Sequence, residues 1–100
     1  MAKPILHYEL SEEADNDLEN IFDYTANEWG VAQAFVYVTA FDVIFENLSV
    51  NPEPGHERNE IREGLRSFVK ESHVIFYRIL KDHIRIVRIL HKSRDVIKFL

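Results

Sequence analysis

The fold is decided by residues 11–31, which read SEEADNDLENIFDYTANEWGV. Ser11 is the expected N-cap of a helix, because its hydroxyl can accept an unpaired backbone N–H and acidic residues fill the first turn after it. Apolar or small side chains then recur at spacings of three and four: Ala14, Leu18, Ile21, Phe22, Thr25 and Trp29. This period predicts an amphipathic helix, and Gly30 suits the left-handed residue that ends it.

A second stripe with the same helical period follows the glycine: Ala34, Phe35, Val38, Phe41, Phe45 and Leu48. The join at Gly30 is too short for parallel helices, so the two helices are predicted to form an antiparallel hairpin. Trp29, beside the helix end, is expected to be a packing anchor. Tyr24 and Tyr37 lie off the strongest apolar lines and are expected to be partly exposed. The helical pattern stops at residues 51–55, which read NPEPG.

The other regular segments have the character of strands. Ile5–Leu10 is a short apolar run before the hairpin, and three β-branched or aromatic runs follow it: Leu65–Val69, His73–Leu80 and Ile84–His91. Residues 56–64 are polar and are expected to form a loop or a short irregular turn. The sequence therefore predicts a single α+β domain over residues 1–100, ordered βααβββ, with the hairpin on one face of a small, mainly antiparallel sheet.

Charge suggests a register for the last two strands. A loop at residues 81–82 would set Arg78 opposite Arg85, and like charges directly opposite each other are destabilising. A loop at residues 82–83 avoids that contact. The predicted pairs are therefore Tyr77 with Arg88 and Arg78 with Val87.

Composition limits the functional classes. The chain has 100 residues, 46% of them hydrophobic, and no cysteine. These values describe one small folded domain, and they exclude a disulfide framework, a thiolate zinc site and a cysteine nucleophile. No uninterrupted apolar run is long enough to cross a bilayer, and the start lacks a signal-peptide pattern. We therefore expect a cytoplasmic protein without a membrane partner.

The formal net charge of −5 hides a strong asymmetry. Residues 1–50 hold one base and ten acids, a net of −9, whereas residues 51–100 hold eleven bases and seven acids, a net of +4. The second half could face an anionic or acidic partner. Ordinary solvated faces would give the same pattern, so both interpretations stay open.

Metal and nucleotide chemistry find little support. The five histidines show no His-x-x-x-His spacing, and only three glycines are present. The chain has neither a Gly-rich phosphate loop nor a Gly-x-Ser-x-Gly elbow. We therefore predict no metal site and no cofactor.

RNA cleavage by acid–base catalysis needs a base, an acid and cations for the phosphoryl group. The residues that could supply these groups are Arg66, Arg88 and His91, with Glu60 or Glu63. Strand alternation places Arg88 and His91 on opposite faces unless a bulge or a strand end intervenes. We therefore favour a structural role for Arg88, bonded to Tyr77 or to a carboxylate.

The last eleven residues, 90–100, combine basic or titratable groups with a very apolar end. Exposing Val96, Ile97, Phe99 and Leu100 together would be unfavourable in water. These side chains either dock on the domain or form a surface that a partner covers.

One family shares many of these spaced positions. The first half contains Tyr8-x-Leu10-Ser11-x-x-Ala14-x-x-Asp17-Leu18-x-x-Ile21-x-x-Tyr24 and Trp29-Gly30-x-x-x-Ala34. The second half contains Asn51-Pro52, Gly55, Ile61-Arg62-Glu63-Gly64-Leu65-Arg66-Ser67, His73-Val74-Ile75-Phe76-Tyr77-Arg78, Ile89-Leu90-His91 and Arg94-Asp95. From about Tyr8 to Asp95 the chain resembles the ParE toxins of the RelE/ParE superfamily, which are toxin halves of type II toxin–antitoxin modules.

This resemblance implies an inhibitor rather than an enzyme. Its implied partners are DNA gyrase, whose inhibition blocks replication, and a ParD-like antitoxin that neutralises the toxin; sequence-specific DNA binding by the toxin alone is not implied. The related RelE branch implies the alternative of an endoribonuclease with Arg66, Arg88 and His91 in its site. The chain lacks the lysine cluster expected of RelE.

The basic, apolar end suggests which residues contact the target. The expected target-binding set is Arg66, His91, Lys92, Arg94, Ile97 and Phe99. The expected antitoxin-binding set is Tyr24, Tyr37, Arg78 and Arg85. An acidic and apolar antitoxin segment would suit the basic second half of the chain.

Overall fold

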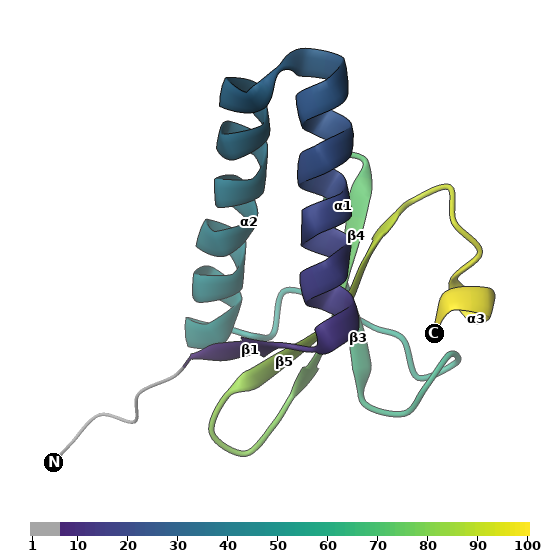
Figure 1. Ribbon diagram of the computed structural model, residues 1–100. Coiled ribbons are helices and arrows are strands. Elements are labelled where there is room, and N and C mark those ends of the chain that lie inside the picture. The colour runs from purple at the N-terminus through teal and green to yellow at the C-terminus, as the bar shows by residue number, and fades with distance from the viewer. Residues whose placement is uncertain (1–6) are drawn as a thin grey trace, which may run out of the picture.

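The computed structural model describes residues 7–100, so residues 5 and 6 of the predicted first strand lie outside the described residues. The elements are β1 (Tyr8–Leu10), α1 (Glu12–Trp29), α2 (Val31–Val50), β2 (His56–Glu57), β3 (Leu65–Lys70), β4 (His73–Ile79), β5 (Ile84–His91) and α3 (Val96–Phe99). The predicted α+β class and the order of the main elements are confirmed (Figure 1). The sequence analysis missed two short elements: β2, in the segment expected to be a loop, and α3.

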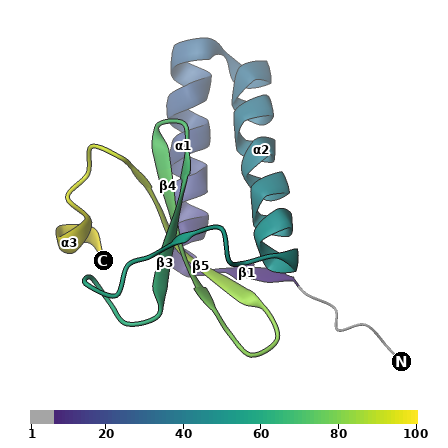
Figure 2. The same ribbon diagram turned by 180° about the vertical axis from the view of Figure 1, so that it is seen from behind.

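The strands form one five-stranded sheet in the order β1-β5-β4-β3-β2. Only β1 and β5 run parallel, and the other neighbours are antiparallel. The chain therefore returns its last long strand to the middle of the sheet, beside its first strand. Seen from behind, the helical hairpin covers one face and the C-terminal segment lies to the other side of the strands (Figure 2).

Ser11 starts α1 as its position predicts. Its hydroxyl oxygen accepts the Ala14 N–H at 2.9 Å and donates to the Val87 carbonyl at 2.7 Å. The cap thus satisfies the helix end and fixes it to β5. Gly30 separates α1 from α2 with a φ of 94°, in the region that favours glycine.

Two apolar clusters lie on opposite faces of the sheet. Beneath the helices, buried helical side chains such as Phe41 and Phe45 pack on Ile75 and Tyr77 of β4 and on Ile86 of β5. On the other face, a smaller cluster of Leu65, Phe76 and Leu90 contacts Val96, Phe99 and Leu100. Those three C-terminal side chains therefore dock on the domain, which is one of the two alternatives that the sequence left open.

The hairpin tip differs from the prediction. Trp29 is 74% exposed and Phe35 is 58% exposed, so Trp29 is not the expected packing anchor. The reason is geometric: the tip of the hairpin stands beyond the sheet and has no strand to cover (Figure 1). Phe35 instead contacts Phe22 of α1, with ring centroids 5.0 Å apart. Tyr24 is exposed and Tyr37 half-buried, as expected.

The predicted register of β4 and β5 was wrong. Arg78 lies opposite Arg85, and an irregularity leaves Tyr77 opposite Ile86 and Phe76 opposite Arg88. A two-residue turn of a primed type favours pairs such as Asn-Gly or Asp-Gly, and Asp82-His83 is not one of them. The chain instead turns at residues 81–82, the loop that the charge argument had set aside, and the Leu80 N–H donates to the His83 carbonyl at 2.8 Å across it. Glu9 on the neighbouring strand lies 3.2 Å from Arg85 and offsets part of the repulsion.

Helix α2 is unusually apolar. Within residues 7–100 it is the one helix long and apolar enough to cross a membrane, with a mean hydropathy of 1.3, and only 22% of that window is buried. Its inner side packs on α1 and the sheet through Ala34, Phe41, Phe45 and Leu48. Core packing therefore explains only part of its apolar character.

Candidate functional site

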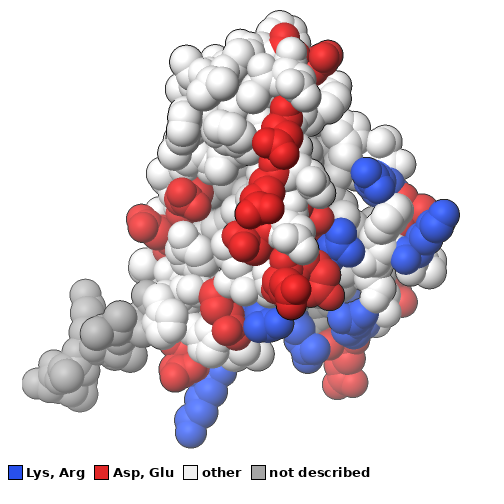
Figure 3. Space-filling model, viewed as in Figure 1, with Lys and Arg blue, Asp and Glu red and all other residues white. Residues whose placement is uncertain are grey.

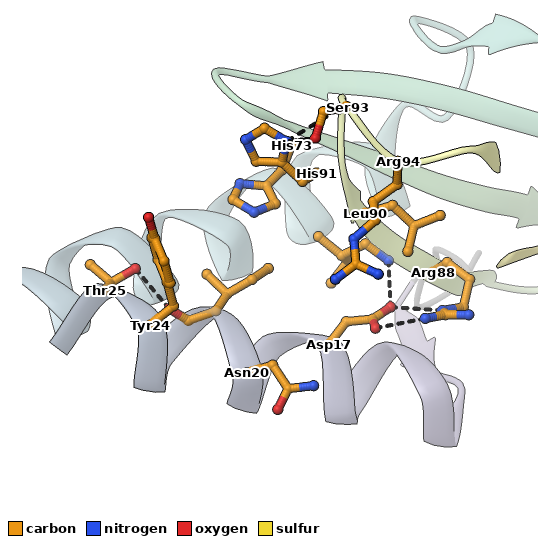
Figure 4. A pocket seen from close by; sticks show the side chains of 12 residues that line it. Asp17, Asn20, Tyr24, Thr25, His73, Arg88, Leu90, His91, Ser93 and Arg94 are labelled. Carbon is orange, nitrogen blue, oxygen red and sulfur yellow. Dashed lines mark hydrogen bonds and ion pairs between the residues drawn. The ribbon is translucent and has the colours of Figure 1, made fainter. Parts of the chain in front are cut away.

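A groove of about 630 Å³ lies between α1 and the end of β5. It exists because β1 pairs with β5 only as far as Ile86. Beyond that residue one edge of β5 is free to face the helix. Asp17 and Tyr24 of α1 line one side, and Arg88, His91 and Arg94 line the other (Figure 4).

Arg88 is held by a carboxylate at the floor of this groove. Its Nε donates to Asp17 Oδ2 at 2.8 Å and its Nη2 to Asp17 Oδ1 at 2.9 Å (Figure 4). Asp17 Oδ2 also accepts the Ile89 N–H at 2.9 Å, and Arg88 Nη1 donates to the Phe99 carbonyl at 2.9 Å. The bond to Asp17 raises the pKa of Arg88. Of the two partners expected for Arg88, the structure shows a carboxylate, Asp17, rather than Tyr77.

Two histidines form the far end of the groove. The rings of His73 and His91 meet edge to face, with centroids 5.4 Å apart. The Tyr37 hydroxyl lies 2.8 Å from His73 Nδ1, and burial, followed by the nearby His91 and Lys70, lowers the pKa of His73. The Ser93 main-chain N–H donates to His91 Nδ1, so neutral His91 carries its proton on Nε2.

Arg66 is far from these groups. Arg66 pairs with Tyr77 of β4, which in turn pairs with Ile86 of β5. His91 is five residues beyond Ile86, so it lies roughly 16 Å farther along the strand at 3.3 Å per residue. The Arg66 guanidinium donates to the main-chain oxygens of Glu53 and Gly55 at 3.1 and 3.2 Å. Arg66 and the pair of Arg88 and His91 are therefore not brought together.

Neither of the two candidate acids lines the groove. Glu60 binds Arg58 at 2.7 Å, and this hydrogen bond lowers the pKa of Glu60. Glu63 is exposed in the turn before β3. Within the part of the chain that the structure describes, no group of three or more histidine, cysteine or acidic residues could hold a metal ion.

Five of the six expected target-binding residues gather at the C-terminal end. His91 and Arg94 line the groove, Lys92 lies between them and is exposed, and the Arg94 guanidinium lies 4.8 Å from the Phe99 ring. Phe99 is half-buried against the sheet, whereas Ile97 is 81% exposed. Ile97 is thus the apolar side chain of this end that has no evident packing role.

The expected antitoxin-binding residues fall into two separate places. Tyr24 and Tyr37 line a second hollow beside the first, together with Trp29 and His73. Arg78 and Arg85 line a pocket of about 330 Å³ on the other face of the sheet. The sequence analysis gave Trp29 and His73 no functional role, because exposure of the hairpin tip is not visible in a helical period.

The pocket on the open face is rich in arginine. Arg62, Arg78, Arg85 and Arg88 all line it. Arg85 pairs with Glu9, Arg88 pairs with Asp17, and Arg62 donates to the Leu100 main-chain oxygen. Among residues 7–100, Arg78 has no acidic group within ion-pair distance. Gly64 gives it room, since an added Cβ there would lie 3.3 Å from Arg78 Nη2. We refer to these four residues as the arginine pocket.

The surface charges also differ between the helical hairpin and the sheet. The acids of α1 form a continuous stripe along the helix, and basic side chains lie below and beside it (Figure 3). Neither α1 nor α2 contains a lysine or an arginine. The hairpin is therefore acidic or apolar, and the basic surface belongs to the sheet and the C-terminal end.

Comparisons with known proteins agree with this architecture. The family model described as "ParE toxin of type II toxin-antitoxin system, parDE" matches residues 8–96. Toxin ParE1 of Mycobacterium tuberculosis is 39% identical over 90 residues, covering 89% of this chain and 92% of the relative. Toxin ParE1 of Caulobacter vibrioides is 36% identical over 88 residues, covering 88% and 91%.

A solved structure titled "Chromosomal ParDE TA system from P. aeruginosa" has the same fold. Its TM-score is 0.76 at 21% identity, and the match covers 89% of this chain and 98% of that chain. The helical hairpin, the five-stranded sheet and the near full-length family match all agree. This chain belongs to the ParE toxin family of type II toxin–antitoxin systems.

Proposed function

We propose that this chain is a cytoplasmic toxin that inhibits DNA gyrase, and so blocks replication, until a cognate ParD-like antitoxin binds it. Membership of the ParE family supports the target and the partner. The inhibition is by binding rather than by catalysis.

The pairing of Arg88 with Asp17 is the observation that carries this proposal. A nuclease would need Arg88 free to stabilise a phosphoryl group. The Nε–Nη2 edge of its guanidinium is instead occupied by the Asp17 carboxylate. Arg66, the second cation of the nuclease alternative, is tied to the loop that carries Glu53 and Gly55.

We place the gyrase contact at the C-terminal end, on His91, Lys92, Arg94, Ile97 and Phe99. These residues combine positive charge with an exposed apolar side chain, as protein-binding surfaces commonly do. Arg66 lies apart from them, so it would contact the target at a separate place. Ile97 is the best residue to test, because a change at an exposed side chain can alter target binding without altering the stability of the fold.

Replacing Ile97→Ser should raise the toxin concentration needed to inhibit supercoiling by about tenfold or more, as loss of an interface anchor does. Its unfolding free energy should stay unchanged, because the side chain is 81% exposed. Val69→Ser is the matched control, since Val69 is 61% exposed on β3. Equal inhibition by the Ile97 and Val69 variants would remove the C-terminal end from the target surface.

We place antitoxin contact in the arginine pocket and in the hollow lined by Tyr24 and Tyr37. Arg78 and Arg85 lie directly opposite each other, an arrangement that destabilises the isolated sheet. An aspartate or glutamate of the antitoxin would offset this repulsion with charge-assisted hydrogen bonds. The acid stripe of α1 beside the pocket would repel a nucleic-acid backbone more than a single carboxylate.

Replacing Arg78→Gln should weaken binding of the cognate antitoxin by about tenfold to a hundredfold, because a charged hydrogen-bond partner is lost. The same change should leave the toxin as stable as before or more stable, because the repulsion with Arg85 disappears. Lys81→Gln, an exposed base outside the pocket, is the control for a loss of charge. Calorimetric titration would measure both affinities, and equal affinities would contradict a role for the pocket.

A further inference from the structure

Helix α2 carries a regular apolar stripe on the side that faces away from the core. Val36, Val43 and Val50 are spaced by seven residues and are 62%, 57% and 70% exposed. Val43 lies between Phe41 and Phe45, which are fully buried, so the valine stripe runs along the opposite side of the helix. An apolar stripe left exposed on a helix commonly marks a surface that another molecule covers.

The residues around this stripe allow a second helix to approach closely. Ala32, Thr39 and Asn47 share this side of α2 and are small or uncharged. A spacing of seven residues keeps the stripe nearly straight, as in the seam between two slightly crossed helices. The only charged residues of α2 are Asp42 and Glu46, which lie at one flank of the stripe.

We propose that α2 pairs with α2 of a second copy of this chain, antiparallel and centred on Val43. The stripe is symmetric about Val43, so a two-fold axis there sets Val43 against its own copy and Val36 against Val50. Antiparallel helices also oppose their dipoles favourably. Each Glu46 then lies at the level of Ala40 in the other copy rather than facing its own copy.

The uncharged stripe suits a second copy better than an acidic segment such as the one expected of the antitoxin. Neither α1 nor α2 has a lysine or an arginine, so an acidic segment finds no cation on the hairpin. A second copy offers an uncharged stripe of matching spacing. The pairing also leaves the arginine pocket open, because that pocket lies on the sheet face away from the helices.

The contact should be modest in strength. Three valines per copy make a smaller seam than the roughly 20–30 residues per side of a standard interface, so the dimer should dissociate on dilution. The acids Asp42 and Glu46 of both copies lie on the same flank of the seam. Their repulsion should make the dimer stronger when salt screens it.

The absence of cysteine from the chain permits a clean cross-linking test of the full-length protein. Under mild oxidation Val43→Cys should form a disulfide-linked dimer in at least tenfold higher yield than Val69→Cys, an exposed control on β3. Val36→Cys and Val50→Cys should each stay at the control level alone and cross-link with each other when mixed. Efficient cross-linking of Val36→Cys with itself would overturn the antiparallel arrangement.

Sedimentation equilibrium of the unmodified chain provides the second readout. We expect a concentration-dependent dimer that Val43→Lys converts to a monomer, while its circular dichroism spectrum stays the same. A wild-type chain that is monomeric at every concentration, with Val43→Cys at the control yield, would overturn the proposal.

Discussion

Asp17 joins three parts of the chain through one carboxylate. It binds the Nε–Nη2 edge of Arg88 and accepts the Ile89 N–H, and Nη1 of the same arginine donates to the Phe99 carbonyl. Helix α1, strand β5 and the C-terminal α3 therefore depend on one ion pair whose side chains are 11% and 20% exposed. Because the pair is largely shielded from water, removing one partner should matter more than at a surface ion pair.

Replacing Asp17→Asn should lower the free energy of unfolding by about 2–3 kcal/mol, because a shielded guanidinium loses its counter-charge. Urea unfolding at pH 7 measures this change. Asp23→Asn is the control, since Asp23 is an exposed acid on the same helix. If the two variants lose the same small amount of stability, the Asp17 pair has no structural role.

His73 should make stability depend on pH. Burial and the nearby His91 lower its folded pKa, so the unfolded chain binds the proton more readily than the folded chain. The free energy of unfolding should therefore be highest above the ordinary histidine value of about 6.5, and His73 should contribute a loss of stability as pH falls below it.

An NMR titration of the histidine ring protons measures this directly. The midpoint of His73 should lie below about 6.5, and His73→Asn should reduce the loss of stability between pH 7 and pH 5. A midpoint above the ordinary value would reverse the sign and contradict the structure.

At the scale of elements, the sequence predicted the two long helices, the strands other than β2 and the class of the sheet. Ser11 and Gly30 mark the helix ends chemically, and the helical period marks the buried side, so these features could be predicted locally. The strand register could not be predicted locally, because it depends on an ion pair between Glu9 and Arg85. These two residues are 76 positions apart in the sequence and lie on different strands. Exposure of Trp29 could not be predicted either, since it depends on how far the hairpin extends past the sheet.

The candidate site was likewise predictable only where it depends on local chemistry. A carboxylate partner for Arg88 was expected from the chemistry of a half-buried arginine. The pairing of the strands decides that Asp17 is this partner and that Arg66 lies elsewhere. The C-terminal end was recognised as apolar and basic, but only the fold shows that Ile97 faces solvent while Phe99 docks.

The buried hydroxyl of Tyr77 helps Arg66 to hold the loop between α2 and β3 on the sheet. Tyr77 donates to the Pro52 carbonyl at 2.6 Å and accepts the Gly55 N–H at 3.0 Å. Gly55→Ala should lower the free energy of unfolding by about 2–3 kcal/mol, because its Cβ would overlap the fully buried Tyr77 ring.

Gly30→Ala is the informative comparison for that loop. A Cβ at Gly30 meets nothing within 4 Å, so only its backbone, with φ 94° and ψ 160°, opposes the change, at about 1–3 kcal/mol. Thermal unfolding of both variants should rank Gly55→Ala as the less stable. The opposite ranking would show that Tyr77 does not fix the loop.

At the scale of the whole molecule, the surface separates into regions of different chemistry. The α1 face is acidic, the outer α2 face is apolar, and the open sheet face with the C-terminal end is basic. In our account the basic regions serve the target and the antitoxin, and the apolar face serves a second copy. The target and antitoxin surfaces meet at two residues, because His91 also lines the hollow of Tyr24 and Tyr37 and Phe99 also lines the arginine pocket. Self-association uses other residues, so it can be tested by separate variants.

The central claim is that the chain is a gyrase inhibitor without nuclease activity. The most direct test is a supercoiling and cleavage assay with purified gyrase, relaxed and supercoiled plasmid, and this protein, with an RNA-integrity control in the same buffer. We predict loss of supercoiling, accumulation of linear DNA trapped in the gyrase complex, and intact RNA. Normal gyrase activity together with cleaved RNA would contradict the account and would return Arg66, Arg88 and His91 to consideration as catalytic residues.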